Sequence, residues 1–127
     1  MSLHFEDGFH LVLKSDCPTC TLIEPEIRKL VESGDFGQTL RIHIQDDPLY
    51  LSDPSQSVSD ASLESSYRLK IETVPTLIRF ENGEETSRSV GWVREEWSQL
   101  LNDSMFGEHL PESRPGCGSL TVMPGAE

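Results

Sequence analysis

The sequence has few basic residues and no long apolar segment. Ten Lys and Arg stand against 22 Asp and Glu in 127 residues, a formal net charge of −12. Nucleic-acid phosphates and anionic lipids both need a basic surface. No apolar run approaches the roughly 20 residues that cross a bilayer, and no basic-then-apolar signal peptide opens the chain. We therefore expect one monomeric globular domain in the cytoplasm, with neither nucleic acid nor membrane as a partner.

Cysteine is also scarce, with one residue at each of positions 17, 20 and 117. An odd number argues against a framework of structural disulfides. Cys17 and Cys20 form a Cys-x-x-Cys pair, which without a secretion signal indicates redox or metal chemistry. A closed zinc site needs four ligands, and only Cys117 and four scattered histidines remain. We expect no metal, and we favour a redox pair over a zinc half-site or two inert core cysteines.

The residue pattern alternates between strand and helix signals. Apolar runs and the Asn82-Gly83 hairpin signature predict strands at 9–14, 40–45, 76–80 and 84–90. Apolar residues at helical spacing predict helices from the cysteine pair to residue 33, at 60–70 and at 93–101. Residues 49–60 predict a long loop. The order β-α-β-α-β-β-α is typical of a four-stranded mixed α/β sheet with helices on both faces.

The cysteine pair lies where the first predicted strand meets the first predicted helix. Unpaired backbone N–H groups at a helix N-terminus favour the thiolate, which is the attacking species in disulfide exchange. We expect Cys17 to attack a substrate disulfide, and Cys20, one turn further on, to resolve the mixed disulfide. Pro18 suits the first helical turn, where its missing N–H costs little.

Several motifs in the correct order together resemble the thioredoxin superfamily over roughly residues 9–102. They are Cys17-Pro18-Thr19-Cys20, Pro25 in the following helix, Ile44–Pro48 after the second strand, Val74-Pro75-Thr76, the Asn82-Gly83 turn and Val90-Gly91. The resemblance implies a thioredoxin-like domain over residues 4–106 and a thiol–disulfide oxidoreductase that needs no cofactor. It also implies a redox-active disulfide between Cys17 and Cys20.

The resemblance further assigns substrate-binding roles to Val74, Pro75 and Gly91. The Val74–Pro75 bond is expected to be cis, with Pro75 beside the cysteine pair and the backbone of Val74 open to a substrate strand. The alternative for Pro75 is an ordinary proline that begins a strand.

Two positions depart from the thioredoxin pattern. Asp16 stands where thioredoxins carry a tryptophan, and a negative charge there is expected to raise the Cys17 pKa. Leu11 stands where thioredoxins bury an acid that takes the proton of the resolving thiol. Without that base, we expect a slow or specialised exchanger.

Glutaredoxins give a rival comparison. Lys14, the proline after Cys17, and Thr73-Val74-Pro75 are similar to glutaredoxin features. Glutathione is anionic, however, and this chain is acidic, so charge favours protein disulfide substrates with an upstream thiol reductant. A non-catalytic thioredoxin-fold interaction module of a larger redox protein is the alternative from another class.

The last 21 residues contain Gly, Pro and Ser without periodicity. This composition predicts a flexible C-terminal tail or linker over residues 107–127. Cys117 lies in it between Gly116 and Gly118. Two interpretations stay open: a linker cysteine of no consequence, or a redox relay that is itself a substrate of the Cys17–Cys20 pair.

Overall fold

The computed structural model describes residues 7–33, 40–46, 57–60 and 63–120. Its elements run β1 (Gly8–Leu13), α1 (Pro18–Ser33), β2 (Leu40–Ile44), β3 (Ser57–Ser59), α2 (Glu64–Leu69), β4 (Thr73–Val74), β5 (Thr76–Glu81), β6 (Glu84–Val90), β7 (Trp92–Val93), α3 (Arg94–Leu101), β8 (Ser113–Arg114) and β9 (Cys117–Gly118). This confirms the mixed α/β class. No helix within the described ranges combines the length and apolar character needed to cross a membrane.

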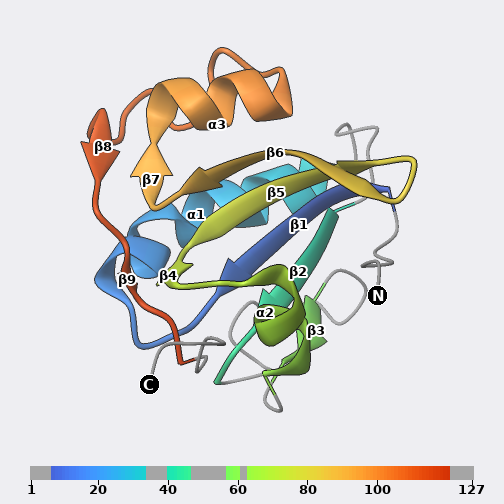
Figure 1. The fold of residues 1–127 in the computed structure, drawn as a ribbon. Coiled ribbons are helices and arrows are strands. Elements are labelled where there is room, and N and C mark those ends of the chain that lie inside the picture. The colour runs from blue at the N-terminus through green and yellow to red at the C-terminus, as the bar shows by residue number, and fades with distance from the viewer. Residues whose placement is uncertain (1–6, 34–39, 47–56, 61–62, 121–127) are drawn as a thin grey trace.

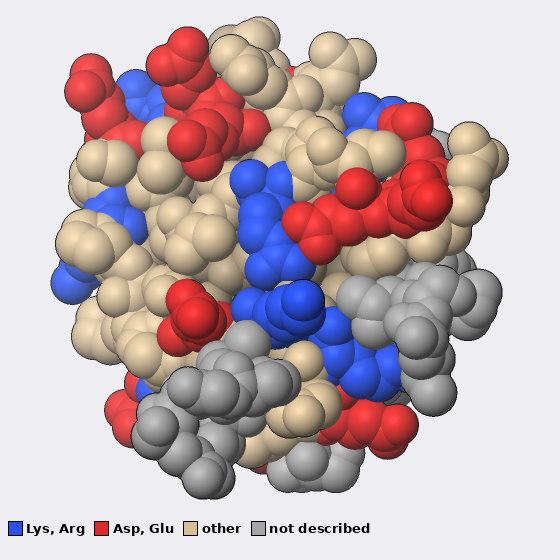
Figure 2. Space-filling model, viewed as in Figure 1, with Lys and Arg blue, Asp and Glu red and all other residues tan. Residues whose placement is uncertain are grey.

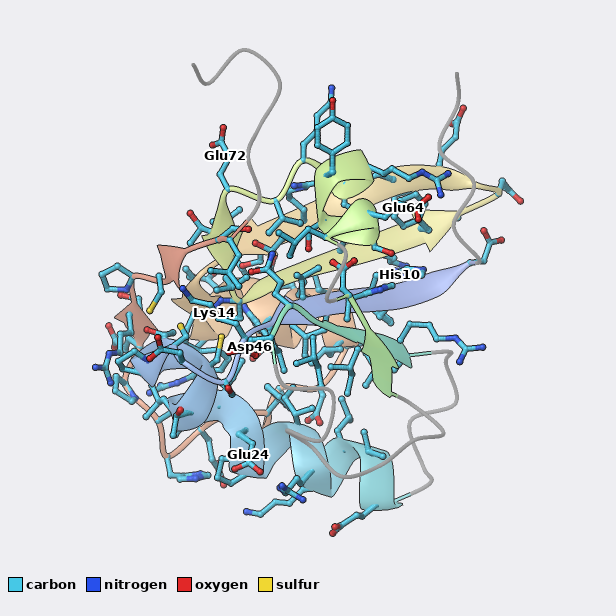
Figure 3. All side chains as sticks on the ribbon, turned by 90° about the horizontal axis from the view of Figure 1, so that it is seen from below. His10, Lys14, Glu24, Asp46, Glu64 and Glu72 are labelled. Carbon is cyan, nitrogen blue, oxygen red and sulfur yellow. The ribbon has the colours of Figure 1, made fainter. Side chains whose placement is uncertain are left out.

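The main sheet is mixed, with the strand order β3-β2-β1-β5-β6 among the described residues. The central strand β1 is parallel to β2 and antiparallel to β5. Five of its six residues are buried, as expected for a strand covered on both sides. Helices α1 and α2 lie on opposite faces of the sheet (Figures 1 and 3).

The edge strand β3 departs from the prediction of a loop over residues 49–60. It extends the four predicted strands by pairing parallel to β2, with Ser57 opposite Ile42 and Ser59 opposite Ile44. A run rich in Ser carries little apolar periodicity, so its residues do not predict a strand. Residues 49–56 of the expected loop lie outside the described residues.

The tight turn between β5 and β6 follows the Asn-Gly signature. Asn82 and Gly83 both have positive φ, 55° and 79°, the conformation that a type I′ hairpin requires. The Asp7 carboxylate accepts hydrogen bonds from both backbone N–H groups, at 3.0 and 2.9 Å. These bonds lower the pKa of Asp7.

The C-terminal segment differs most from the prediction. Instead of a flexible tail from residue 107, β8 pairs antiparallel with β7, and β9 pairs antiparallel with β4. The indole N–H of Trp92 donates to the carbonyl of Pro111 at 2.8 Å. The packed unit therefore extends past residue 106 to at least Leu120, and residues 121–127 lie outside the described residues.

Acidic side chains do not cover the surface evenly. Figure 2 shows a band of Lys and Arg, bordered by Asp and Glu, on the face where α2 lies. Arg88 contacts α2 directly, because its guanidinium donates to the carbonyl of Leu69, the last residue of that helix, at 2.8 Å. The same guanidinium forms an ion pair with Glu85. The net charge of −12 thus describes the whole chain and not each face.

Candidate functional site

Cys17 occupies the junction between β1 and α1. Its carbonyl accepts the backbone N–H of Thr21 at 2.9 Å, the first bond of the helix, and its Sγ lies 3.4 Å from the backbone N of Cys20. The sequence folds this way because the buried strand ends at Leu13 and Pro18 begins the helix. The helix N-terminus therefore points a backbone donor at the Cys17 sulfur, as predicted.

The two cysteines of the pair have opposite pKa shifts. Burial opposes charge on Cys17, but hydrogen bonds from the Cys117 thiol and the Cys20 backbone outweigh it and lower the Cys17 pKa. Cys20 is fully buried, and burial raises its pKa strongly. At neutral pH, Cys17 is thus the readier thiolate and Cys20 stays protonated.

The predicted substrate-binding residues lie opposite Cys17. The Val74–Pro75 bond is cis, as the resemblance implied. The Cys17 Sγ lies 3.7 Å from the carbonyl oxygen of Val74, and the Gly91 N–H donates to the Pro75 carbonyl at 2.8 Å. Val74 therefore borders Cys17, and Gly91 is bonded to the adjacent Pro75. The Val74 backbone, expected to be open to a substrate strand, is instead buried and paired with Cys117 of β9.

Cys117 is the third sulfur of the site. Its Sγ lies 2.7 Å from that of Cys17, although the two residues are 100 positions apart. Strand β9 places it there, because Cys117 is the register partner of Val74 in the β4–β9 pair. No disulfide joins any of the three cysteines, all of which are described. In Figure 3, sulfur atoms gather where α1 begins.

The segment around Cys117 is held by contacts on both sides. The Thr19 hydroxyl donates to the Pro115 carbonyl at 2.6 Å, and the Ser119 N–H donates to the Glu72 carbonyl at 3.0 Å. The Gln45 side-chain amide donates to the Ser119 hydroxyl at 2.7 Å and accepts the Leu120 N–H at 3.0 Å. The cysteine is therefore docked at the site by hydrogen bonds of its neighbours.

The opposing effect expected of Asp16 is not among the causes of the Cys17 pKa shift. The Cys17 pKa is lowered, and the causes of the shift are burial and hydrogen bonds, without a contribution from Asp16. Asp16 is exposed, so solvent screens its charge. Its backbone N–H donates to the Asp46 carboxylate at 3.2 Å, which also accepts bonds from Ser15. Figure 3 shows Asp46 close to Lys14 at this end of β1.

Leu11 is fully buried in the hydrophobic core. It lies in the middle of β1, opposite Leu77 of β5 and Ile42 of β2. An aliphatic side chain at this position cannot accept the proton of Cys20. Burial raises the pKa of Cys20, which favours its protonated form.

Sequence reasoning missed the residues that dock the C-terminal segment, namely Thr19, Gln45 and Ser119. Their polar side chains carry no motif, so only their contacts identify them. The glycines around Cys117 are the available sequence signal, but their pattern predicts flexibility and not a close contact. Gly116 instead permits close approach, because a Cβ there would overlap the carbonyl oxygen of Val74.

Comparisons with known proteins do not identify the chain. No family model matches it, and no curated protein matches it. Within the described ranges, no group of three or more His, Cys, Asp or Glu residues could hold a metal ion.

Proposed function

We propose that this protein is a thioredoxin-like thiol–disulfide oxidoreductase acting on protein disulfides. The observation that carries the proposal is the position of the Cys17 sulfur. It lies at the N-terminus of α1, 3.7 Å from the carbonyl oxygen of Val74, the residue before cis Pro75. A thiol there has a helix-terminal donor on one side and, on the other, strand β4, whose edge β9 occupies in this structure.

The first step is attack by the Cys17 thiolate on one sulfur of a substrate disulfide. A bond forms between the two sulfurs, and the substrate's own disulfide bond breaks. The second substrate sulfur leaves with the electron pair as a thiolate and takes a proton from water. The product is a mixed disulfide held beside Val74.

Cys20 completes the exchange. After losing its proton, Cys20 attacks the Cys17 sulfur and forms the Cys17–Cys20 disulfide. The substrate sulfur that was bonded to Cys17 leaves as a thiolate. The substrate gains two electrons, and an upstream thiol reductant returns the protein to its dithiol form. Since burial raises the Cys20 pKa and Leu11 supplies no base, loss of the Cys20 proton should limit the rate.

Insulin reduction with dithiothreitol as the electron donor tests the proposal. The wild-type chain should exceed the rate with dithiothreitol alone, and Cys17→Ser should return the rate to that background. Cys20→Ser combined with Cys117→Ser leaves no second thiol beside Cys17, and this double variant should accumulate a mixed disulfide between Cys17 and insulin, visible by mass spectrometry. Wild-type turnover no faster than dithiothreitol alone, with no trapped adduct, would instead support a non-catalytic interaction module.

A further inference from the structure

The segment that carries Cys117 has the form of a bound substrate strand. It pairs antiparallel with β4, with Cys117 opposite Val74 and Gly118 opposite Thr73. Addition of an extended segment to a free strand edge is a common mode of peptide recognition, in which backbone bonds supply affinity and register sets specificity. The register here places a cysteine sulfur 2.7 Å from the Cys17 nucleophile.

We propose that β9 is an internal substrate of the cysteine pair, and that Cys117 is a third redox cysteine that forms a disulfide with Cys17. The proposal rests on the exchange chemistry proposed above and names its first substrate as a segment of the same chain. An external protein disulfide would then reach Cys17 only after displacing β9 from β4.

The contacts around β9 are specific to this register. Pro115, two residues before Cys117, accepts the Thr19 hydroxyl, and Thr19 lies inside the Cys-x-x-Cys motif. Ser119, two residues after it, donates to the backbone carbonyl of Glu72. A shift by one residue would break both bonds and turn the Cys117 side chain to the other face of the strand.

The two glycines beside Cys117 have different surroundings. A Cβ on Gly116 would overlap the Val74 carbonyl oxygen and the Thr73 side chain, whereas a Cβ on Gly118 would meet nothing within 4 Å. Gly91 faces the same segment, since a Cβ there would lie 3.1 Å from the backbone N of Gly116. The close approach of Gly116 to β4 therefore needs a residue without a side chain.

The exchange is an isomerisation of one disulfide. In the oxidised protein, the Cys117 thiol loses its proton to water and attacks the Cys17 sulfur. The Cys17–Cys117 bond forms as the Cys17–Cys20 bond breaks. Cys20 leaves with the electron pair and takes a proton from water, so no external oxidant or reductant is consumed. Attachment to the same chain gives Cys117 a high effective concentration at this sulfur.

The first test uses Cys20→Ser in the full chain, reduced and then treated with oxidised glutathione. Glutathione should form a mixed disulfide with Cys17, which Cys117 then displaces as reduced glutathione. Peptide mapping without reductant should find Cys17 linked to Cys117 as the main product. A stable glutathione adduct on Cys17, with no internal link, would overturn the proposal.

A matched pair of glycine variants in the same background tests the strand pairing. Gly116→Ala should slow formation of the internal disulfide at least tenfold, and Gly118→Ala should leave the rate within a factor of two. If Gly116→Ala unfolds the chain, Thr19→Val provides the second variant, since it removes only the bond to Pro115, and it should also slow the reaction. Equal rates in the folded variants would contradict the register argument.

Insulin reduction by Cys117→Ser separates this proposal from the proposed function. Turnover by that variant without any Cys17–Cys117 link in Cys20→Ser supports the oxidoreductase and rejects the internal substrate. Formation of the link without insulin reduction by either the wild type or Cys117→Ser supports the internal substrate and rejects activity on general protein disulfides. If neither the Cys17–Cys117 link nor insulin reduction is observed, both proposals are rejected.

Discussion

At Cys17, burial and hydrogen bonding act on the same thiol in opposite directions. Burial favours the neutral form, while donors from Cys117 and the Cys20 backbone favour the thiolate, and the net pKa is lowered. Cys20 has no comparable set of donors, and its pKa is raised. The proposed division of roles between nucleophile and resolver therefore agrees with where each sulfur lies relative to the helix N-terminus.

Removing Cys117 should raise the Cys17 pKa. In a Cys20→Ser background, Cys117→Ala deletes the thiol that donates to the Cys17 thiolate and leaves the helix-terminal donors in place. The pH midpoint for alkylation of Cys17 by iodoacetamide should move upward relative to Cys20→Ser alone. An unchanged midpoint would mean that Cys117 does not contact the thiolate in solution.

His43 should make the fold sensitive to acid. Burial, the nearby His10 and Arg41 outweigh the opposite effect of Asp60 and lower its pKa from 6.5 to about 4. Because the folded pKa lies below the unfolded one, the unfolded state binds more protons between these values. The contribution of His43 to stability is therefore fully present above pH 6.5. The free energy of unfolding falls by about 3 kcal/mol in total as the pH drops toward 4.

The measurement is urea unfolding of wild type and His43→Gln at a series of pH values. Glutamine keeps a hydrogen-bonding group for His10, whose Nδ1 lies 3.0 Å from the His43 Nε2, but it does not titrate. The wild type should lose more stability than the variant between pH 6.5 and 4. Parallel curves would show that His43 is not the group responsible.

At the scale of elements, α2 depends on a residue outside it. Its N-cap Leu63 has positive φ and supplies no side-chain cap. The Asp60 carboxylate instead accepts the backbone N–H groups of Ser65 and Ser66, each at 3.0 Å, and also bonds the Ser66 hydroxyl. Asp60 therefore caps the helix from outside it, and the helix begins at Glu64, four residues after the start of the predicted range 60–70.

Asp60→Ala should destabilise the protein by about 1–2 kcal/mol, since it leaves two helical donors without this acceptor. Asp60→Asn keeps one acceptor oxygen and should cost less. Thermal unfolding monitored by circular dichroism at neutral pH compares the two with wild type. Equal losses for both variants would indicate that the carboxylate charge, and not the capping geometry, is what α2 needs.

At the scale of the whole molecule, the site joins the two ends of the domain. Cys17 follows the first strand, and Cys117 lies near the end of the described chain, 100 residues later. Figure 1 shows β9 returning past the start of α1, beside β4. A bond between these cysteines would close nearly the entire domain into one loop.

The two oxidised forms should therefore differ in stability. By chain entropy, a Cys17–Cys117 disulfide closing about 100 residues stabilises by about 4–5 kcal/mol, against about 2 kcal/mol for the short Cys17–Cys20 loop. Urea unfolding of oxidised and reduced Cys20→Ser measures the first, and the same comparison on Cys117→Ser measures the second. A larger gain for Cys117→Ser would contradict the long-loop assignment.

The local pattern determined the parts of the fold that depend on neighbouring residues. Alternating apolar runs located β1, β2 and β5, and the Asn82-Gly83 pair located the hairpin, because backbone preference and periodicity act over a few residues. The same holds for the cysteine pair, because the strand before it and the helix after it are both predicted from residues next to it in the sequence. The resemblance added the cis bond before Pro75.

Only the tertiary structure decided where Cys117 lies. From the sequence, two glycines beside a cysteine in an aperiodic segment indicate a flexible tail, since nothing local pairs with them. The strand edge that receives them, β4, lies more than forty residues away, and its register with β9 depends on the Gly116 contact with Val74. Such long-range pairing leaves no periodic pattern in the sequence, so the third sulfur of the site is placed by tertiary contacts alone.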